Sequence, residues 1–141
     1  MSMEIKKFKN ELIAFDFDNE IVNATDMLRN YPEKRMNNFL RNEQTKEFIK
    51  VLERSARISA PDFKAVTQTI NVYGKSSGTW MHKLLAYKFA AWLNPEFEVF
   101  IYSTFDKAVK KQVSELVEAK RQAEIREGYA WNSLDRNDLY S

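Results

Sequence analysis

Residues 33–41 (EKRMNNFLR) combine side chains that can contact nucleic acid with the spacing of a short helix. Met36, Phe39 and Leu40 recur at helical spacing, so we expect them to face inward. The residues left to face outward are Lys34, Arg35, Asn37, Asn38 and Arg41. Arginine can form two parallel hydrogen bonds with guanine, and asparagine can do so with adenine. The alternative is an ordinary solvated helix face, which the residues alone favour.

Residues 73–78 (YGKSSG) form a second candidate, a glycine-bounded loop that could contact phosphate groups. Lys75 supplies a positive charge, and Ser76, Ser77 and the following Thr79 supply hydrogen-bond donors. A nucleotide-binding P-loop is not expected, because its spacing of glycines and lysine is absent. A plain hairpin turn is the competing interpretation.

The sequence predicts no catalytic residue, no metal ligand and no cofactor, and we expect a protein that is not an enzyme. His82 is the only histidine and there is no cysteine, so His82 is expected to form structural hydrogen bonds. Asp16, Asp18 and Glu20 occupy alternate positions along the chain. Clusters of carboxylates of this kind can bind Mg²⁺ in nucleases. These three lie far in sequence from the basic segments, so we interpret them as a solvent-facing edge. A small metal-dependent nuclease is the weakest alternative.

Composition places these candidates in one compact domain. The chain has 141 residues, of which 44% are hydrophobic and 13% aromatic, enough to build a packed core. The net charge is only +2, but residues 29–57 carry 8 basic and 4 acidic side chains, and residues 64–88 carry 4 lysines without an acid. This distribution predicts one positive face. Neither a signal peptide nor a membrane-spanning segment is recognisable, so we expect a cytoplasmic protein.

The elements that must position these residues follow from periodicity and breakers. We expect a hairpin within residues 12–22, a short helix opened by Asn23, the short helix at residues 33–41 and a longer helix at about residues 42–57. A second hairpin follows at residues 66–81, then a helix at about residues 82–93 and a long helix from Pro95 past Glu124. Short helices before a hairpin with a basic tip are typical of an α+β winged helix-turn-helix.

Three segments resemble the motifs of a known family, the KilA-N domain. Residues 21–28 (IVNATDML) are similar to its opening element VNATxxL. Residues 78–86 (GTWMHKLLA) resemble GxWxHPxLA, and residues 90–97 (AAWLNPEF) resemble AxWLSPEF. The three segments occur in the family's order and spacing. Lys83 replaces a common proline, and Asn94 replaces a common serine whose capping role it can keep.

The resemblance implies a DNA-binding domain of the kind that bacteriophages, prophages and large DNA viruses carry. The family is related to the fungal APSES domain, a winged helix-turn-helix, and residues 33–41 would be its recognition helix. We therefore expect a domain at residues 1–110, a helical extension at residues 111–128 and a flexible tail at residues 129–141. The expected function is binding of double-stranded DNA as a phage- or prophage-derived regulator.

The long last helix supports an alternative, a protein-interaction module or homodimer. Beyond Phe105 its apolar positions are Val109, Val113, Leu116 and Val117. One small domain is too short to cover a helix of that length. The remaining aromatic residues are assigned to the core rather than to base stacking, because they fit an inward helix face: Trp80, Phe89, Trp92 and Phe97.

Overall fold

The computed structural model describes residues 3–69 and 77–127. The expected loop residues Lys75 and Ser76 and the expected tail at residues 129–141 lie outside the described residues. The chain divides into two compact units, Met1–Phe105 and Asp106–Ser141, which are considered separately.

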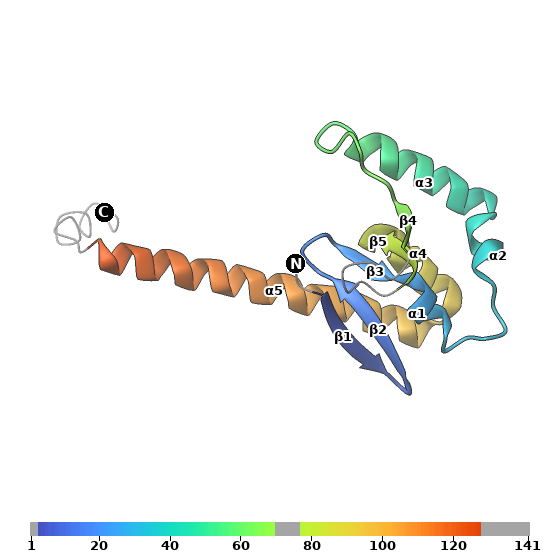
Figure 1. Cartoon of the computed structure of the whole chain (residues 1–141), viewed down its shortest axis with the longest axis horizontal. Coiled ribbons are helices and arrows are strands. Elements are labelled where there is room, and N and C mark those ends of the chain that lie inside the picture. Colours follow the sequence, from blue (N-terminus) through green and yellow to red (C-terminus); the bar gives the residue numbers. More distant parts are fainter. Residues whose placement is uncertain (1–2, 70–76, 128–141) are drawn as a thin grey trace. The chain divides into compact units, whose positions relative to one another are not determined.

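The first unit contains an antiparallel sheet of five strands in the order β1-β2-β3-β5-β4 (Figure 1). The strands are β1 (Met3–Phe8), β2 (Glu11–Asp16), β3 (Ile21–Asn23), β4 (Val66–Thr69) and β5 (Gly78–His82). The two expected strand pairs, β2–β3 and β4–β5, are confirmed. Strand β1 was not predicted. It forms an edge of the sheet, where its alternating charged side chains remain in water.

Five helices accompany the sheet among the described residues. They are α1 (Ala24–Leu28), α2 (Met36–Leu40), α3 (Glu43–Ala56), α4 (Lys83–Leu93) and α5 (Pro95–Arg126). The order matches the expected α+β arrangement with a long last helix. The helix expected at residues 33–41 is shorter than predicted. Arg35 has an extended backbone, with φ −121° and ψ 133°, so α2 begins only at Met36.

Aromatic side chains join the sheet to the part of α5 that belongs to the first unit. Phe15 and Phe17 of the β2 region stack at 5.1 Å, and Phe105 meets Phe15 edge-on at 5.4 Å. Phe8 of β1 packs against Phe97 of α5 at 4.9 Å. The expected core residues Trp80, Phe89 and Phe97 are buried, whereas Trp92 is only half-buried.

Asp16 does not belong to a solvent-facing edge, and that prediction is wrong for this residue. Its side chain is 0% exposed, while Asp18 and Glu20 are exposed as expected. The Asp16 carboxylate accepts hydrogen bonds from the Asn19 backbone at 3.2 Å and from the Asn19 amide at 2.9 Å. Asp16 therefore stabilises the turn between β2 and β3, which offsets the cost of burying its carboxylate.

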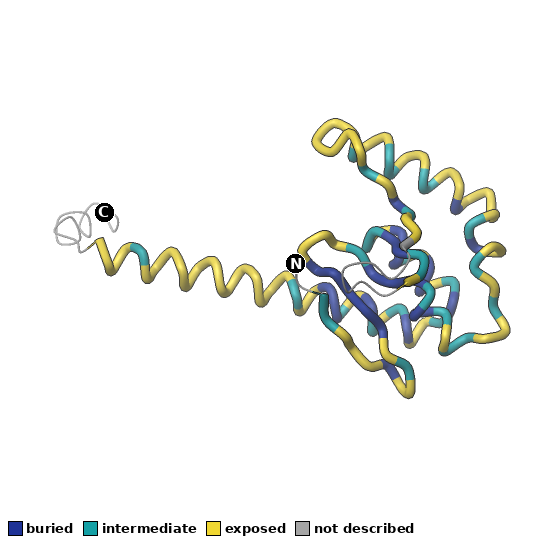
Figure 2. The backbone as a smooth tube through the Cα atoms, in the orientation of Figure 1, coloured by how far each residue is buried: buried dark blue, intermediate teal, exposed yellow. Residues whose placement is uncertain are grey.

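Helices α2 and α3, with the turn between them and the flanking residues Arg35 and Arg57, form what we call the α2–α3 arm, residues 35–57. Figure 2 shows that the arm is mainly exposed, in contrast to the buried segments of the sheet and α4. Only Phe39 of α2 and Thr45 of α3 are buried. In the second unit, α5 is exposed along most of residues 106–126. Of the helices in the described ranges, none has the length and apolar character to cross a membrane.

Candidate nucleic-acid interface

The outward side chains of α2 are available for contacts with a ligand. Arg35, Asn37, Asn38 and Arg41 are all exposed. Phe39 is buried against Phe89 of α4, with ring centroids 4.8 Å apart, which holds α2 with its polar residues toward solvent. Two arginines and two amides are therefore presented within one short segment. Their contact with DNA stays a prediction.

Lys34 occupies a different environment from the other four residues. It is half-buried, and its ammonium donates a hydrogen bond to the Trp92 carbonyl oxygen at 3.1 Å. The same ammonium lies 4.7 Å from the centre of the Trp92 ring, a cation–π distance. This double contact fastens the segment before α2 to α4. A role for Lys34 in binding DNA would require it to give up part of that contact.

Helix α3 begins at a side-chain cap and packs against the rest of the first unit with one side only. The Asn42 side chain accepts hydrogen bonds from the Gln44 and Thr45 backbones at 2.8 and 3.4 Å, which satisfies two donors of the first turn. Phe48, Ile49 and Leu52 provide the inward side, and all are half-buried. Glu53 accepts a hydrogen bond from the Ala65 backbone at 2.8 Å and so connects α3 to the start of β4.

The outer side of α3 carries a row of basic residues that sequence reasoning missed. We call it the α3 basic face, and it consists of Lys46, Lys50, Arg54 and Arg57. All four are exposed. Lys46 lies 3.8 Å from Glu43, whereas the other three make no ion pair with a described residue. In the sequence, the spacing of four residues between Lys46, Lys50 and Arg54 indicates that these bases share one side of the helix.

The second hairpin is described only at its base. Ser77 is exposed, and its backbone carbonyl accepts a hydrogen bond from the Asn23 amide at 3.2 Å. Thr79 is half-buried, and its backbone N–H donates to the Thr25 hydroxyl at 3.0 Å. Gly78 lies between them with φ +143°, a conformation that side chains rarely adopt. The hairpin base is therefore attached to the start of α1.

Residues of the first motif, 21–28, build this attachment rather than a contact surface. The buried Asn23 side chain accepts from the Asp26 backbone at 3.2 Å and caps α1. Asp26 accepts from the Ala14 backbone at 3.0 Å and from Arg29 at 2.6 Å. Burial raises the pKa of Asp26, and these two donors partly offset that shift.

The other two motifs supply helix caps. The Nδ1 atom of His82 accepts from the Leu84 backbone at 3.2 Å at the start of α4, which confirms the structural role expected for His82. Burial lowers the pKa of His82. Asn94 caps α5 by accepting from the Glu96 backbone at 2.8 Å, ahead of which Pro95 occupies the first helical position. Lys83, at the position where a proline is common, pairs with Glu20 at 2.5 Å.

The carboxylates of the described residues do not gather into a metal site. Within residues 3–69 and 77–127, no group of three or more histidine, aspartate or glutamate side chains is placed to hold a metal ion. Asp16 is buried in its own turn and so is separated from the exposed Asp18 and Glu20. The geometry required for the nuclease alternative is therefore lacking in the described part of the chain.

Comparison with known proteins gives one match. The model of the KilA-N domain matches residues 6–111, from β1 into α5. No curated protein and no solved structure shows significant similarity to the chain.

Proposed function

Because this chain belongs to the KilA-N family, whose domains generally bind DNA, we propose that it binds double-stranded DNA through the α2–α3 arm. The observation that carries the proposal is the α3 basic face together with the exposed arginines and amides of α2. Phosphate contacts supply most of the affinity of such proteins, and base contacts supply the sequence preference.

The two helices of the arm have different tasks in this proposal. Lys46, Lys50, Arg54 and Arg57 contact phosphates, because they are separate cations along one exposed side of a helix. Arg35, Asn37, Asn38 and Arg41 contact base edges in the major groove. Lys34 remains part of the proposed surface, where it contacts the phosphate group of the DNA that lies nearest Trp92. In the second hairpin, Lys75, Ser76, Ser77 and Thr79 contact the backbone of the adjacent groove.

We propose that the chain acts as a regulator derived from a phage or prophage. A domain that presents base-reading and phosphate-binding side chains can alter transcription by occupying a site. The domain limits proposed are residues 1–110 for DNA binding, residues 111–128 for a helical extension and residues 129–141 for a tail.

Salt dependence of DNA binding tests the α3 basic face. A variant with Lys46, Lys50, Arg54 and Arg57 changed to glutamine loses up to four phosphate contacts. The slope of log affinity against log salt should then become shallower by about 3 to 4, at roughly 0.9 for each contact. Fluorescence anisotropy with a labelled duplex gives this slope.

The matched control changes Lys107, Lys111, Lys120 and Arg126 of α5 to glutamine. It removes the same charge from exposed positions outside the arm. This variant should keep the wild-type slope. If both variants lose the same affinity, binding reflects total charge and the assignment to α3 is wrong.

A second substitution tests the role of α2. Arg35→Ala combined with Arg41→Ala should weaken binding to a selected site by about 1 to 3 kcal/mol for each lost base contact. Binding to unrelated duplexes should change less. Oligonucleotide selection from a random pool supplies the site, and unchanged affinity in a gel-shift titration would contradict the proposal for α2.

The second unit supports self-association as an additional function. Val109, Val113, Leu116 and Val117 are exposed on α5. A second copy could cover these side chains, and a dimer would bring two DNA-binding arms to one duplex. Sedimentation tests this with the wild type and with Leu116→Glu. A monomer at tens of micromolar for the wild type would remove the dimer from the proposal.

A further inference from the structure

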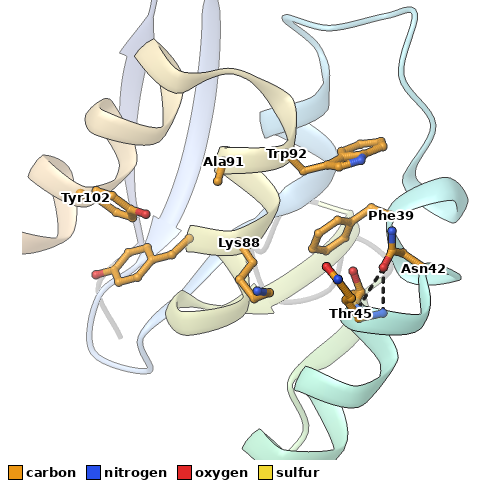
Figure 3. A pocket seen from close by; sticks show the side chains of 9 residues that line it. Phe39, Asn42, Thr45, Lys88, Ala91, Trp92 and Tyr102 are labelled. Atoms are coloured by element: carbon orange, nitrogen blue, oxygen red, sulfur yellow. Dashed lines mark hydrogen bonds between the residues drawn. The ribbon is translucent and has the colours of Figure 1, made fainter.

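A cavity of about 350 Å³ lies between the first turn of α3, the outer side of α4 and the start of α5 (Figure 3). It belongs to the first unit. Its volume falls at the lower end of the range of pockets that hold small molecules. None of the contacts proposed above for DNA involves its interior.

Aromatic rings form two walls of this cavity. On one side Phe39 and Trp92 meet with centroids 5.6 Å apart, and on the other Tyr87 meets Tyr102 edge-on at 4.8 Å. Figure 3 shows Ala91 between Trp92 and Tyr102. Ala91 is exposed and small, so the space between the two aromatic pairs stays open. Such walls suit a flat ring, which gains offset or edge-to-face contacts.

The polar lining favours a negative group. Lys88 is the one charged side chain that lines the cavity, and it makes no ion pair within the described residues. Its ammonium lies 5.0 Å from the centre of the Phe48 ring. No aspartate or glutamate is among the described residues that line the cavity, and the Glu98 carboxylate accepts a hydrogen bond from the Tyr102 hydroxyl. An anionic ligand would therefore meet an uncompensated cation at Lys88.

Thr45 provides an independent indication of a ligand. The residue is only 4% exposed and lines the cavity. Its backbone N–H binds Asn42, but its hydroxyl has no hydrogen-bond partner among the described residues. Because no fully enclosed side-chain nitrogen or oxygen in the described part of the chain lacks a partner, the Thr45 hydroxyl keeps some accessible surface, and this cavity is the opening that Thr45 lines. It is thus a donor available to a bound molecule.

We propose that this cavity binds a small planar anion, an aromatic or heteroaromatic ring that carries one phosphate or carboxylate group. The ring lies between the Trp92 and Tyr102 walls and over Ala91. The anionic group accepts hydrogen bonds from the Lys88 ammonium and the Thr45 hydroxyl. The site shares Trp92 with the position proposed for Lys34, but the argument for it uses only the cavity lining and does not depend on the proposed function.

Amide chemical shifts of the whole chain test the proposal. The probes are adenosine 5′-monophosphate and benzoate as planar anions, adenosine as an uncharged ring and inorganic phosphate as an anion without a ring. At about 5 mM, a ligand of millimolar affinity occupies most of its site. Both planar anions should shift amides around Thr45, Lys88 and Ala91. Adenosine and phosphate should each bind at least threefold more weakly.

Two variants locate the binding. Ala91→Phe fills the space between the walls and should abolish the shifts caused by both planar anions. Lys88→Gln should weaken adenosine monophosphate about three- to fivefold, the effect of one partly solvated charge, and leave adenosine unchanged. Lys107→Gln, in the exposed part of α5, should have no effect on any probe.

Three results would overturn the proposal. One is the absence of shifts with both planar anions. Another is shifts that survive Ala91→Phe or map to the α3 basic face, since these would mean general attraction of anions to the basic side chains. The third is equal affinity of the wild type and Lys88→Gln for adenosine monophosphate. Thermal unfolding of each variant verifies that it is folded before the titration.

Discussion

The sheet with α1, α4 and residues 95–105, which we call the core, differs from the α2–α3 arm in what its residues do. In the core, motif residues are buried and bonded to one another, as Asn23 is to Ser77 and Asp26 is to Ala14. In the arm, charged residues face solvent and few contacts restrain them. The motifs that reveal the family therefore specify the fold. The residues proposed to contact DNA lie between those motifs, except for Thr79, which belongs to the motif at residues 78–86.

The largest expected difference between the two regions is in packing. Phe97→Ala in the core should lower the free energy of unfolding by about 3 to 5 kcal/mol, because Phe97 is fully buried against Phe8 and Phe100. Val51→Ala on the outside of the arm should change it by less than about 0.5 kcal/mol. Denaturant unfolding measures both. Equal losses would mean that the arm is packed as firmly as the core.

The next prediction concerns the hairpin base. A Cβ atom at Gly78 would lie 2.8 Å from the Asn23 Oδ1 and 2.9 Å from the Thr25 Oγ1, at a φ of +143°. Gly78→Ala should therefore lower stability by about 2 to 3 kcal/mol through steric conflict and backbone strain. Ser77→Ala is the control, because Ser77 uses its backbone carbonyl to bind Asn23. A stable Gly78→Ala variant would show that the base can shift without cost.

His82 makes the stability of the core depend on pH. His82→Ala should cost about 1 kcal/mol through loss of the α4 cap. Because burial lowers the pKa of His82 below its unfolded value of 6.5, the unfolded state binds more protons. The stabilisation that neutral His82 provides is fully present above pH 6.5. It is lost as the pH falls through the pKa that His82 has in the folded protein.

His82→Asn provides the comparison, since it keeps a capping oxygen and does not titrate. The difference in unfolding free energy between the wild type and this variant, measured from about pH 7.5 down to pH 5, isolates the histidine. The wild type should lose unfolding free energy relative to His82→Asn as the pH falls. A difference that is constant with pH would mean that the cap tolerates a protonated ring. Asp26, whose raised pKa acts with the opposite sign, cancels in this comparison.

The smallest expected effects are those of replacing Lys34 and Lys50, one on stability and the other on DNA binding. Lys34→Gln should lower stability by about 0.5 to 1 kcal/mol, because it removes the cation from the Trp92 ring. Lys50→Gln should leave stability unchanged and make the salt dependence of DNA binding shallower by about 0.9. Unfolding curves and anisotropy titrations of both variants give the comparison. The reverse result would mean that the Trp92 ring does not hold Lys34 and that Lys50 makes no phosphate contact.

The sequence was sufficient for most of the core because local rules determine it. Asn23 and Asn94 were expected to cap helices, and each accepts backbone hydrogen bonds at a helix start. The β-branched residues after Val66 and the residues around Trp80 were expected to pair, and they do. These predictions need only a few neighbouring residues, whose preferences agree with the tertiary structure.

Features that depend on distant contacts were not predicted. Asp16 resembles any acid next to a turn, and its burial and its hydrogen bonds to Asn19 become visible only in the folded chain. The cavity beside Ala91 requires α3, α4 and α5 to be positioned together. Lys34 was grouped with exposed bases because helical spacing was assumed from residue 33, whereas the extended Arg35 places it next to Trp92.

The attachment of the arm through one buried residue in each of its helices, Phe39 and Thr45, has a consequence for motion. Segments that bury little apolar surface open locally at a lower free energy than the whole molecule. Amide protons of α3 should therefore exchange with deuterium faster than those of α4, whose residues Leu85, Ala86, Phe89 and Ala90 are fully enclosed. A bound duplex should slow that exchange more in the arm than in α4, since it restrains the segment that opens first.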